Sequence, residues 1–408
     1  MPLPTRHQAP GATGSPAPEA AAGPPVLWLA LLATPVALSA NSPVLILPEL
    51  ADALDIRTTQ ATWLVQAFAW AMAVGTPLMA NLLRRRGLGA ALRTSGALVA
   101  AGTLLVALAP WLPLLMAGRA AQAMGGAGLV TSAMSLAGTA RRMGVITAGF
   151  GILGAAGPLL GSLNATVSWR LSLAVSALAL LALPPVLAWS RTAPRPASPT
   201  PFDTRGAALL TLAATSLVFL AHYPLPALAA ALVTAALLTA HVRRARDGFV
   251  PLAVITNRTF VTSALLAMAL STSYFTLLFT IPQLLRDRTD WSTATIGTAQ
   301  LLALATGSLL SWLLAAASSR LPRTRVIALL LTLGALAPLL TALTPWPALL
   351  LPAAALAVFA TTAGNGTLSL YAAHSAPPQD RPTALGLLNL AYQLGGAFGP
   401  AVAGVVMG

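Results

Sequence analysis

The sequence predicts an all-α polytopic membrane protein, and three observations lead to that prediction. Hydrophobic residues make up 57% of the 408 residues, charged residues only 8%, and the mean hydropathy is +0.79. A soluble domain carries about three times that share of charge. All 23 basic residues are arginines that lie between apolar stretches rather than in patches, which argues against a nucleic-acid partner.

Residue types also limit the chemistry. There is no cysteine, so disulfides, thiolate nucleophiles and cysteine-ligated metals are excluded. The four histidines are scattered, so neither a metal site nor a cofactor is expected. Paired carboxylates at depth and a nucleophile with an adjacent base are both missing from the predicted spans, so the chain is not expected to be an enzyme.

Cutting the chain at its charges and Pro/Gly clusters gives about thirteen membrane spans of roughly 20 mainly apolar residues each. They are 26–48, 60–82, 91–109, 111–135, 143–163, 168–189, 206–222, 225–241, 260–284, 295–318, 325–343, 347–371 and 384–407. The pair 206–241 is the least regular part of this division.

Arginine placement predicts the orientation, because short cytoplasmic loops carry the excess of positive charge. With the N-terminus in the cytoplasm, internal segments hold 18 arginines. External loops hold only Arg57, Arg170, Arg286 and Arg288, and Arg119 lies within a span. The opposite orientation would reverse this ratio.

Composition divides the chain further. Residues 1–24, rich in Pro, Ala and Gly, are expected to be a disordered cytoplasmic tail, and 191–205 a cytoplasmic linker. The remaining segments are a six-helix bundle over 25–190, two extra helices over 206–242, and a five-span bundle over 243–408. An odd number of spans places the C-terminus outside, so either a last helix is missing or one division is wrong.

Several local patterns, in order, resemble the major facilitator superfamily, and within it the 14-span drug:proton antiporter branch. The resemblance covers about residues 38–400 and is carried by LPELADALDIRTTQATWLVQAFAWAMAVGTPL (47–78), RAAQAMGGAG from Arg119, GFGILGAAGPLLGS (149–162), Trp169-Arg170, FDTRGAALL (202–210), NRTF (257–260) and LGGAFGPAVAG (394–404). It implies two pseudo-symmetric bundles plus two central helices, and a missing last helix. It also implies a multi-pass monomer of the plasma membrane that performs multidrug efflux, an activity tied to antibiotic resistance.

Three positions depart from the family pattern. In the loop ANLLRRRGLG (80–89), Leu82, Arg85 and Gly87 match the gate motif, but Arg84 replaces the Asp of the usual latch. The symmetry-related loop has Ser319 in the place of its Asp, and the first span has Ser39 where an Asp is usual. These departures place the usual gate latch in doubt.

Candidate pathway residues centre on the deep charge Arg119. A guanidinium within a span usually faces the bundle interior, and the family motif implies that Arg119 and Gln122 tune proton coupling. The alternative is a structural arginine bound to carbonyls or to Gln122. Glu49 and Asp52, three residues apart on a helix, are the best candidate proton sites if partial burial raises their pKa; the alternative is a solvated helix end.

The fifth predicted span is rich in glycine and therefore has few side chains on part of its surface. Gly154, Gly157, Pro158 and Gly161 are predicted to form a hinge between the bundles, as in the antiporter motif, or else plain small-residue packing.

Polar and aromatic residues at helical spacing predict a cavity lining with sparse polar groups, although each one could instead join two helices. They are Asn41, Trp63, Gln66, Trp70, Tyr274, Asn365, Asn389, Tyr392 and Gln393. With Arg119 as the nearby charge, such a cavity should accept neutral or weakly anionic lipophiles.

The predicted function is therefore secondary transport: export of small lipophilic compounds by alternating access, with proton antiport implied by the resemblance. Protons, the substrate and the lipid bilayer are the expected partners. A degenerate scaffold or sensor, favoured by the lost carboxylates and the missing helix, and an uncoupled facilitator remain as alternatives.

Overall fold

The computed structural model describes residues 23–43, 46–165, 167–191, 202–221, 223–245, 248–318 and 320–407. Nearly all of the predicted tail, most of the predicted linker and Ser319 lie outside these ranges. Every element in the described part is helical, as the composition predicts.

The first part of the chain forms a group of helices, here called the N-terminal group. It consists of α1 (Val26–Asn41), α2 (Leu47–Ala53), α3 (Thr58–Ala61), α4 (Trp63–Leu108), α5 (Leu112–Ala137), α6 (Ala140–Ala165), α7 (Trp169–Ala174), the 3₁₀ segment η1 (Val175–Ala182) and α8 (Leu183–Ser190). The last three are continuous in the chain and together cover the predicted span 168–189. The first span ends at Asn41, earlier than predicted.

Two central helices and a C-terminal group follow. The central pair is α9 (Thr204–Val218), extended by η2 (Phe219–Ala221), and α10 (Pro224–Arg244), with the short α11 (Leu252–Ile255) after it. The C-terminal group is α12 (Arg258–Arg288), α13 (Thr293–Ser318), α14 (Arg323–Leu343), η3 (Pro347–Leu349), α15 (Leu350–Ser375), η4 (Pro378–Asp380) and α16 (Arg381–Met407). Among the described helices, eight are long and apolar enough to cross a membrane.

The helix α4 contains two predicted spans and the gate motif between them. The break falls at Gly87, whose φ of 77° lies in the left-handed region that glycine adopts without penalty. The chain therefore reverses direction at a kink, and the predicted loop at 80–89 is shorter than expected.

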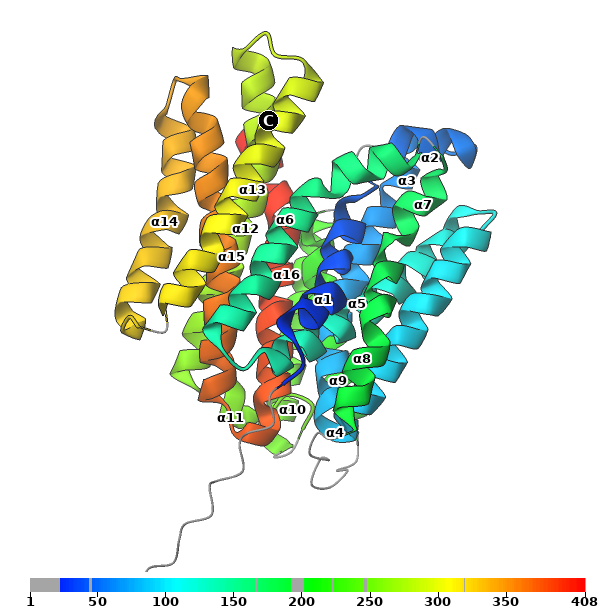
Figure 1. The fold of residues 1–408 in the computed structure, drawn as a ribbon. Helices are drawn as coiled ribbons and strands as arrows, with labels where there is room; N and C mark the ends of the chain where they lie inside the picture. The colour runs from blue at the N-terminus through cyan, green and yellow to red at the C-terminus, as the bar shows by residue number, and fades with distance from the viewer. Residues whose placement is uncertain are drawn as a thin grey trace, which may run out of the picture.

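The two groups pack side by side with α6 and α16 between them (Figure 1). The helix α6 contacts α13 and α15, while α16 contacts α4 and α5. The ends of α10 and α11 lie at one end of the molecule, and α2, α3 and α7 lie at the other. We call the end with α10 and α11 the arginine-rich end. The junctions between helices that lie there carry Arg84, Arg244, Arg323 and Arg381.

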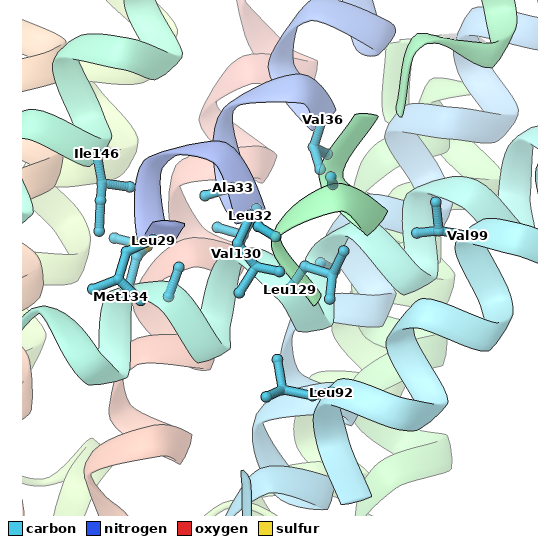
Figure 2. Packing of buried hydrophobic residues seen from close by; sticks show 14 of the residues in the cluster. Leu29, Leu32, Ala33, Val36, Leu92, Val99, Leu129, Val130, Met134 and Ile146 are labelled. Atoms are coloured by element: carbon cyan, nitrogen blue, oxygen red, sulfur yellow. The ribbon is translucent and has the colours of Figure 1, made fainter. Parts of the chain in front are cut away.

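Aliphatic residues hold the N-terminal group together. Figure 2 shows α1 surrounded by side chains of α4, α5 and α6, with Leu29, Leu32, Ala33, Val36, Leu92, Val99, Leu129, Val130, Met134 and Ile146 in one cluster. Glycines permit this approach: a Cβ on Gly125 of α5 would lie 2.5 Å from the carbonyl oxygen of Ser95 on α4. Small residues therefore set the helix spacing, as is common in membranes.

A polar cluster at the arginine-rich end fixes the central pair. The Asp203 carboxylate caps α9 by accepting from the Gly206 amide at 2.8 Å, and it also accepts from the Phe249 amide at 2.8 Å. The His241 Nε2 atom of α10 lies 2.9 Å from both carboxylate oxygens. One side chain thus joins the start of α9, the end of α10 and the segment before α11.

Partial burial acts to raise the pKa of Asp203, but the two amides and His241 outweigh it, so the pKa lies below its ordinary value of 3.8. The ionised carboxylate therefore stabilises this cluster at pH above 3.8, and the stabilisation is lost as the pH falls through the lower folded pKa.

We expect Asp203→Ala to loosen the central pair at this end. Two amides would lose their acceptor, which costs about 1 to 3 kcal/mol for each buried group. Hydrogen exchange at Gly206 and Phe249 should therefore accelerate by roughly tenfold. Asp290→Ala is the matched control, because Asp290 is exposed. Equal exchange in the two variants would contradict the anchoring role.

Candidate functional site

A cavity of about 350 Å³ lies between the two helix groups. Its wall includes residues of α1, α4, α5 and α6 from the N-terminal group and of α12, α15 and α16 from the C-terminal group, and α9 adds Val218. The wall is mainly apolar, with Phe68, Phe150, Phe275 and Phe279 as its phenylalanines. Such a chamber matches the size and character of small-molecule sites.

Seven of the nine predicted cavity residues lie in this wall. They are Asn41, Gln66, Tyr274, Asn365, Asn389, Tyr392 and Gln393. Each bundle therefore contributes carboxamides or phenols to an otherwise apolar surface, and amides can both donate and accept hydrogen bonds. The helical spacing of 389, 392 and 393 on α16 places all three on the cavity side.

Trp63 and Trp70 are the two exceptions, and their placement is a correction. The Trp70 indole donates a 2.9 Å hydrogen bond to Thr215 Oγ1 of α9, and Trp63 packs against the Phe219 ring with centroids 6.2 Å apart. The central helix α9 docks on this face of α4. Gln66 of the same predicted face lies in the cavity wall, whereas the two tryptophans contact α9 and η2, and the sequence contains no signal for which helix covers them.

Two cavity amides are tied to neighbouring helices. Asn41 donates to the carbonyl oxygen of Gly154 on α6 at 2.9 Å, and Asn389 of α16 lies 3.4 Å from the Met134 sulfur of α5. The described wall contains no Asp, Glu, His or Arg. No wall side chain therefore titrates near neutral pH.

Arg119 lies behind this wall and is fully buried, at 0% exposure. Its Nη1 atom donates to Ser39 Oγ at 2.9 Å and to Gln122 Oε1 at 3.1 Å, and Nη2 donates to the Ser39 carbonyl oxygen at 2.8 Å. The Leu173 carbonyl oxygen of α7 lies 3.5 Å from Nη1 and also accepts from Gln122 at 3.1 Å. Neutral acceptors on α1, α5 and α7 thus surround the cation.

Phe68 connects Arg119 to the cavity, a contact that the sequence analysis did not find. The guanidinium carbon lies 4.2 Å from the centre of the Phe68 ring, within cation–π range, and the same residue belongs to the cavity wall. Phe68 is five residues after Trp63 and two before Trp70 on α4. The predicted cavity face on this helix was defined by the two tryptophans and did not include Phe68.

Glu49 and Asp52 lie at a solvated helix end, the second of the two interpretations that the sequence left open. Both side chains are exposed on α2, while Leu50 and Ala51 form its buried side. Because α2 is a separate short helix lying on the end of the bundle, the partial burial that a proton site would need is absent here. Ser39, at the family's acidic position, provides Arg119 with a hydroxyl instead of a carboxylate.

The glycine run of α6 contacts two different partners. A Cβ on Gly157 would lie 2.7 Å from the Asn41 Cβ, and one on Gly161 would lie 2.0 Å from the Ser42 carbonyl oxygen, so both face α1. Gly151 instead faces α13, where a Cβ would lie 2.2 Å from Ser308 Oγ. Pro158 lies inside the continuous helix α6. The hinge remains a prediction.

At the arginine-rich end, an ion pair joins the two groups. Arg84 Nη1 donates to Asp380 Oδ1 at 2.7 Å, and its Nη2 donates to the Gly248 carbonyl oxygen at 3.0 Å. Arg84 precedes the α4 kink, Asp380 immediately precedes α16, and both side chains are nearly buried, at 12% and 11% exposure. Close packing continues beside the pair, where a Cβ on Gly386 would lie 2.4 Å from Ala80 Cβ.

The predicted gate residues surround this pair. Arg85 donates from Nε to Asn81 Oδ1 at 2.9 Å and lies over the Phe202 ring, Gly87 forms the kink, and Leu82 is half-buried. The motif predicted a contact surface here. It did not predict that Arg84, placed where the family has an acid, would meet an acid on the other group.

Comparisons with known proteins agree with this architecture. The family described as Major Facilitator Superfamily matches residues 27–400. The crystal structure of the E. coli fucose:proton symporter is similar with a TM-score of 0.60 and 15% identity, covering 94% of this chain and 91% of that one. A POT family transporter in complex with a thioalcohol-conjugated peptide has a TM-score of 0.56 and 12% identity, covering 94% and 90%. No curated protein sequence matches.

We expect Ser39→Ala to destabilise the protein by about 2 kcal/mol. The buried guanidinium of Arg119 would lose one of its hydrogen-bond acceptors, and hydrogen bonds to charged groups contribute more than those between neutral groups. The thermal unfolding temperature of purified protein should fall relative to wild type. Ser216→Ala is the control, since its hydroxyl makes a hydrogen bond only to its own helix at an exposed position. The same unfolding temperature for Ser39→Ala and wild type would contradict this assignment.

Proposed function

The chain belongs to the major facilitator superfamily, a family of secondary transporters, and from that premise we propose that it exports small lipophilic compounds by alternating access. The observation that carries the proposal is the uncharged apolar cavity walled by both helix groups. A site at the interface of two bundles can open to either face when the bundles rock against each other. Its location in the plasma membrane is part of the proposal.

The charge class of the substrate follows from Arg119. A unit charge about 8 Å away, at an effective dielectric constant of about 20, shifts the energy of a charged ligand by about 2 kcal/mol. The cation behind Phe68 therefore favours anions and opposes cations, and no wall carboxylate reverses this in the described residues. Neutral and weakly anionic lipophiles fit such a chamber best.

Two driving modes are consistent with transport. Proton antiport is implied by the resemblance to drug:proton antiporters, and the structurally similar fucose transporter is a proton symporter. The uncoupled facilitator is favoured by one observation, the lack of Asp, Glu and His in the described wall. A scaffold is disfavoured, since it would have no use for a chamber of this volume, whereas a sensor would bind its ligand there without transporting it.

The Arg84–Asp380 pair serves, in this proposal, as the latch that closes the arginine-rich end. In the family latch the Asp lies in the loop after the second span. Here that position is Arg84 on α4, and the acid, Asp380, lies before α16. Breaking a nearly buried pair by removing one partner is strongly destabilising for the state that contains it. Loss of the acid should therefore shift the equilibrium toward opening at this end.

The latch can be measured with a cysteine reporter, because the chain has no cysteine of its own. We expect Asp380→Asn to raise labelling of Thr362→Cys, a cavity position, by an impermeant maleimide from the arginine-rich face. A shift of about 2 kcal/mol corresponds to roughly 30-fold in the open-to-closed ratio. Asp290→Asn should have no effect. Unchanged labelling in Asp380→Asn would remove the latch from the proposal.

Transport itself is tested by accumulation of matched neutral, anionic and cationic lipophiles in efflux-deficient cells, with and without a protonophore. We expect lower accumulation of the neutral and anionic members, restored by Arg119→Gln for the anionic ones. Restoration by the protonophore would identify antiport, and insensitivity would identify the facilitator. Preferential export of quaternary ammonium dyes, or no difference for any compound with the protein in the membrane, would overturn the proposal.

A further inference from the structure

Arg119 has more hydrogen-bond donors than its surroundings accept. A guanidinium carries five N–H groups. In the described part of the chain, Nη1 has three neighbouring acceptors, Nη2 donates only to the Ser39 carbonyl oxygen, and Nε has no partner. The Nε–H group and one N–H of Nη2 are thus unused, and Nε and Nη2 form one of the sides through which a guanidinium binds a carboxylate by two parallel hydrogen bonds.

The charge of Arg119 is also unpaired. Within the described residues the ion pairs are Arg84 with Asp380 and Asp203 with His241, both at the arginine-rich end. A fully buried cation held only by neutral acceptors is costly to maintain. An incoming oxyanion would supply both the missing charge and the missing acceptors.

Two helices that contribute to the cavity wall also contact this group. On α4, Phe68 covers the guanidinium at 4.2 Å and is itself only 3% exposed. On α1, Ser39 binds the guanidinium while the next two residues, Ala40 and Asn41, line the cavity. The cation is therefore separated from the chamber by one aromatic ring and one turn of helix.

We propose that Arg119 is an oxyanion subsite of the central cavity, covered by Phe68, which receives the carboxylate of an amphiphilic substrate when the ring moves aside. The proposal rests on the transport function proposed above and names its substrate class: apolar molecules with one carboxylate. Phe68 is then the specificity-determining residue, because the position of its ring determines whether the charge of Arg119 is screened from the cavity or accessible from it.

The test compares 4-phenylbenzoate with 4-phenylbenzamide, which share a shape and differ in charge. In proteoliposomes, Phe68→Leu should raise the ratio of carboxylate to amide transport by roughly tenfold. Phe260→Leu is the matched control, because Phe260 is a buried phenylalanine of α12 that does not line the cavity. Its ratio should stay within about twofold of wild type. The gain should disappear in Phe68→Leu combined with Arg119→Gln.

Direct binding separates this proposal from the transport proposal. Calorimetry of purified protein in nanodiscs should show tighter 4-phenylbenzoate binding in Phe68→Leu than in wild type, again lost with Arg119→Gln. If wild type transports neither compound, the transport proposal fails, while binding still tests the subsite. Unchanged binding in a variant that unfolds at the wild-type temperature, or a gain that survives Arg119→Gln, would overturn the subsite. Phe68→Met serves if Phe68→Leu does not fold.

Discussion

The N-terminal group depends on how a buried guanidinium is satisfied without a counter-ion. Water cannot reach Arg119, so its donors must find acceptors among helices that have already used most of their carbonyl groups. The Ser39 carbonyl on α1 and the Leu173 carbonyl on α7 are available, and Gln122 lies one turn further along α5. By binding both carbonyls, one side chain fixes α1 and α7 against α5, and this places Asn41 of α1 at the cavity wall; the contact with the Phe68 ring adds α4.

The close packing around that cation is possible only because side chains are missing elsewhere. A Cβ on Gly102 would lie 2.6 Å from the Gln122 amide nitrogen, so this glycine brings α4 against α5 beside the Arg119 site. Gly157 and Gly161 do the same for α6 against α1. Lipid tails are as apolar as leucine, so helices in a bilayer gain stability from such close contact rather than from escape from water. The same glycines therefore shape one side of the chamber.

The helical class could be predicted from the sequence, because hydropathy and helical spacing are local properties of the chain. The spacing of Asn389, Tyr392 and Gln393 fixes a common face, and all three lie in the cavity wall, although their role in binding stays a prediction. Trp63 and Trp70 lie outside the wall, because the docking of α9 on that side of α4 is a tertiary choice between two plausible neighbours. The sequence left Glu49 and Asp52 open between a proton site and a solvated helix end. The structure has the second, because Pro43 and Pro48 lie where the chain leaves the first span and α2 then lies across the end of the bundle.

Charge placement connects the gate with the central helices. Arg84 binds both Asp380, which immediately precedes α16, and the Gly248 carbonyl, which follows α10. The adjacent Phe249 amide is bound to Asp203 at the start of α9. Opening the arginine-rich end by separating α4 from α16 must therefore break a contact to the central pair, or carry that pair with one of the two groups. The Trp70 hydrogen bond to Thr215 ties α9 to α4, whereas Ala207 of α9 and Val242 of α10 pack in the hydrophobic core of the C-terminal group. The central pair is therefore attached to both groups, and separating α4 from α16 must break one of these two attachments as well as the Arg84–Asp380 pair.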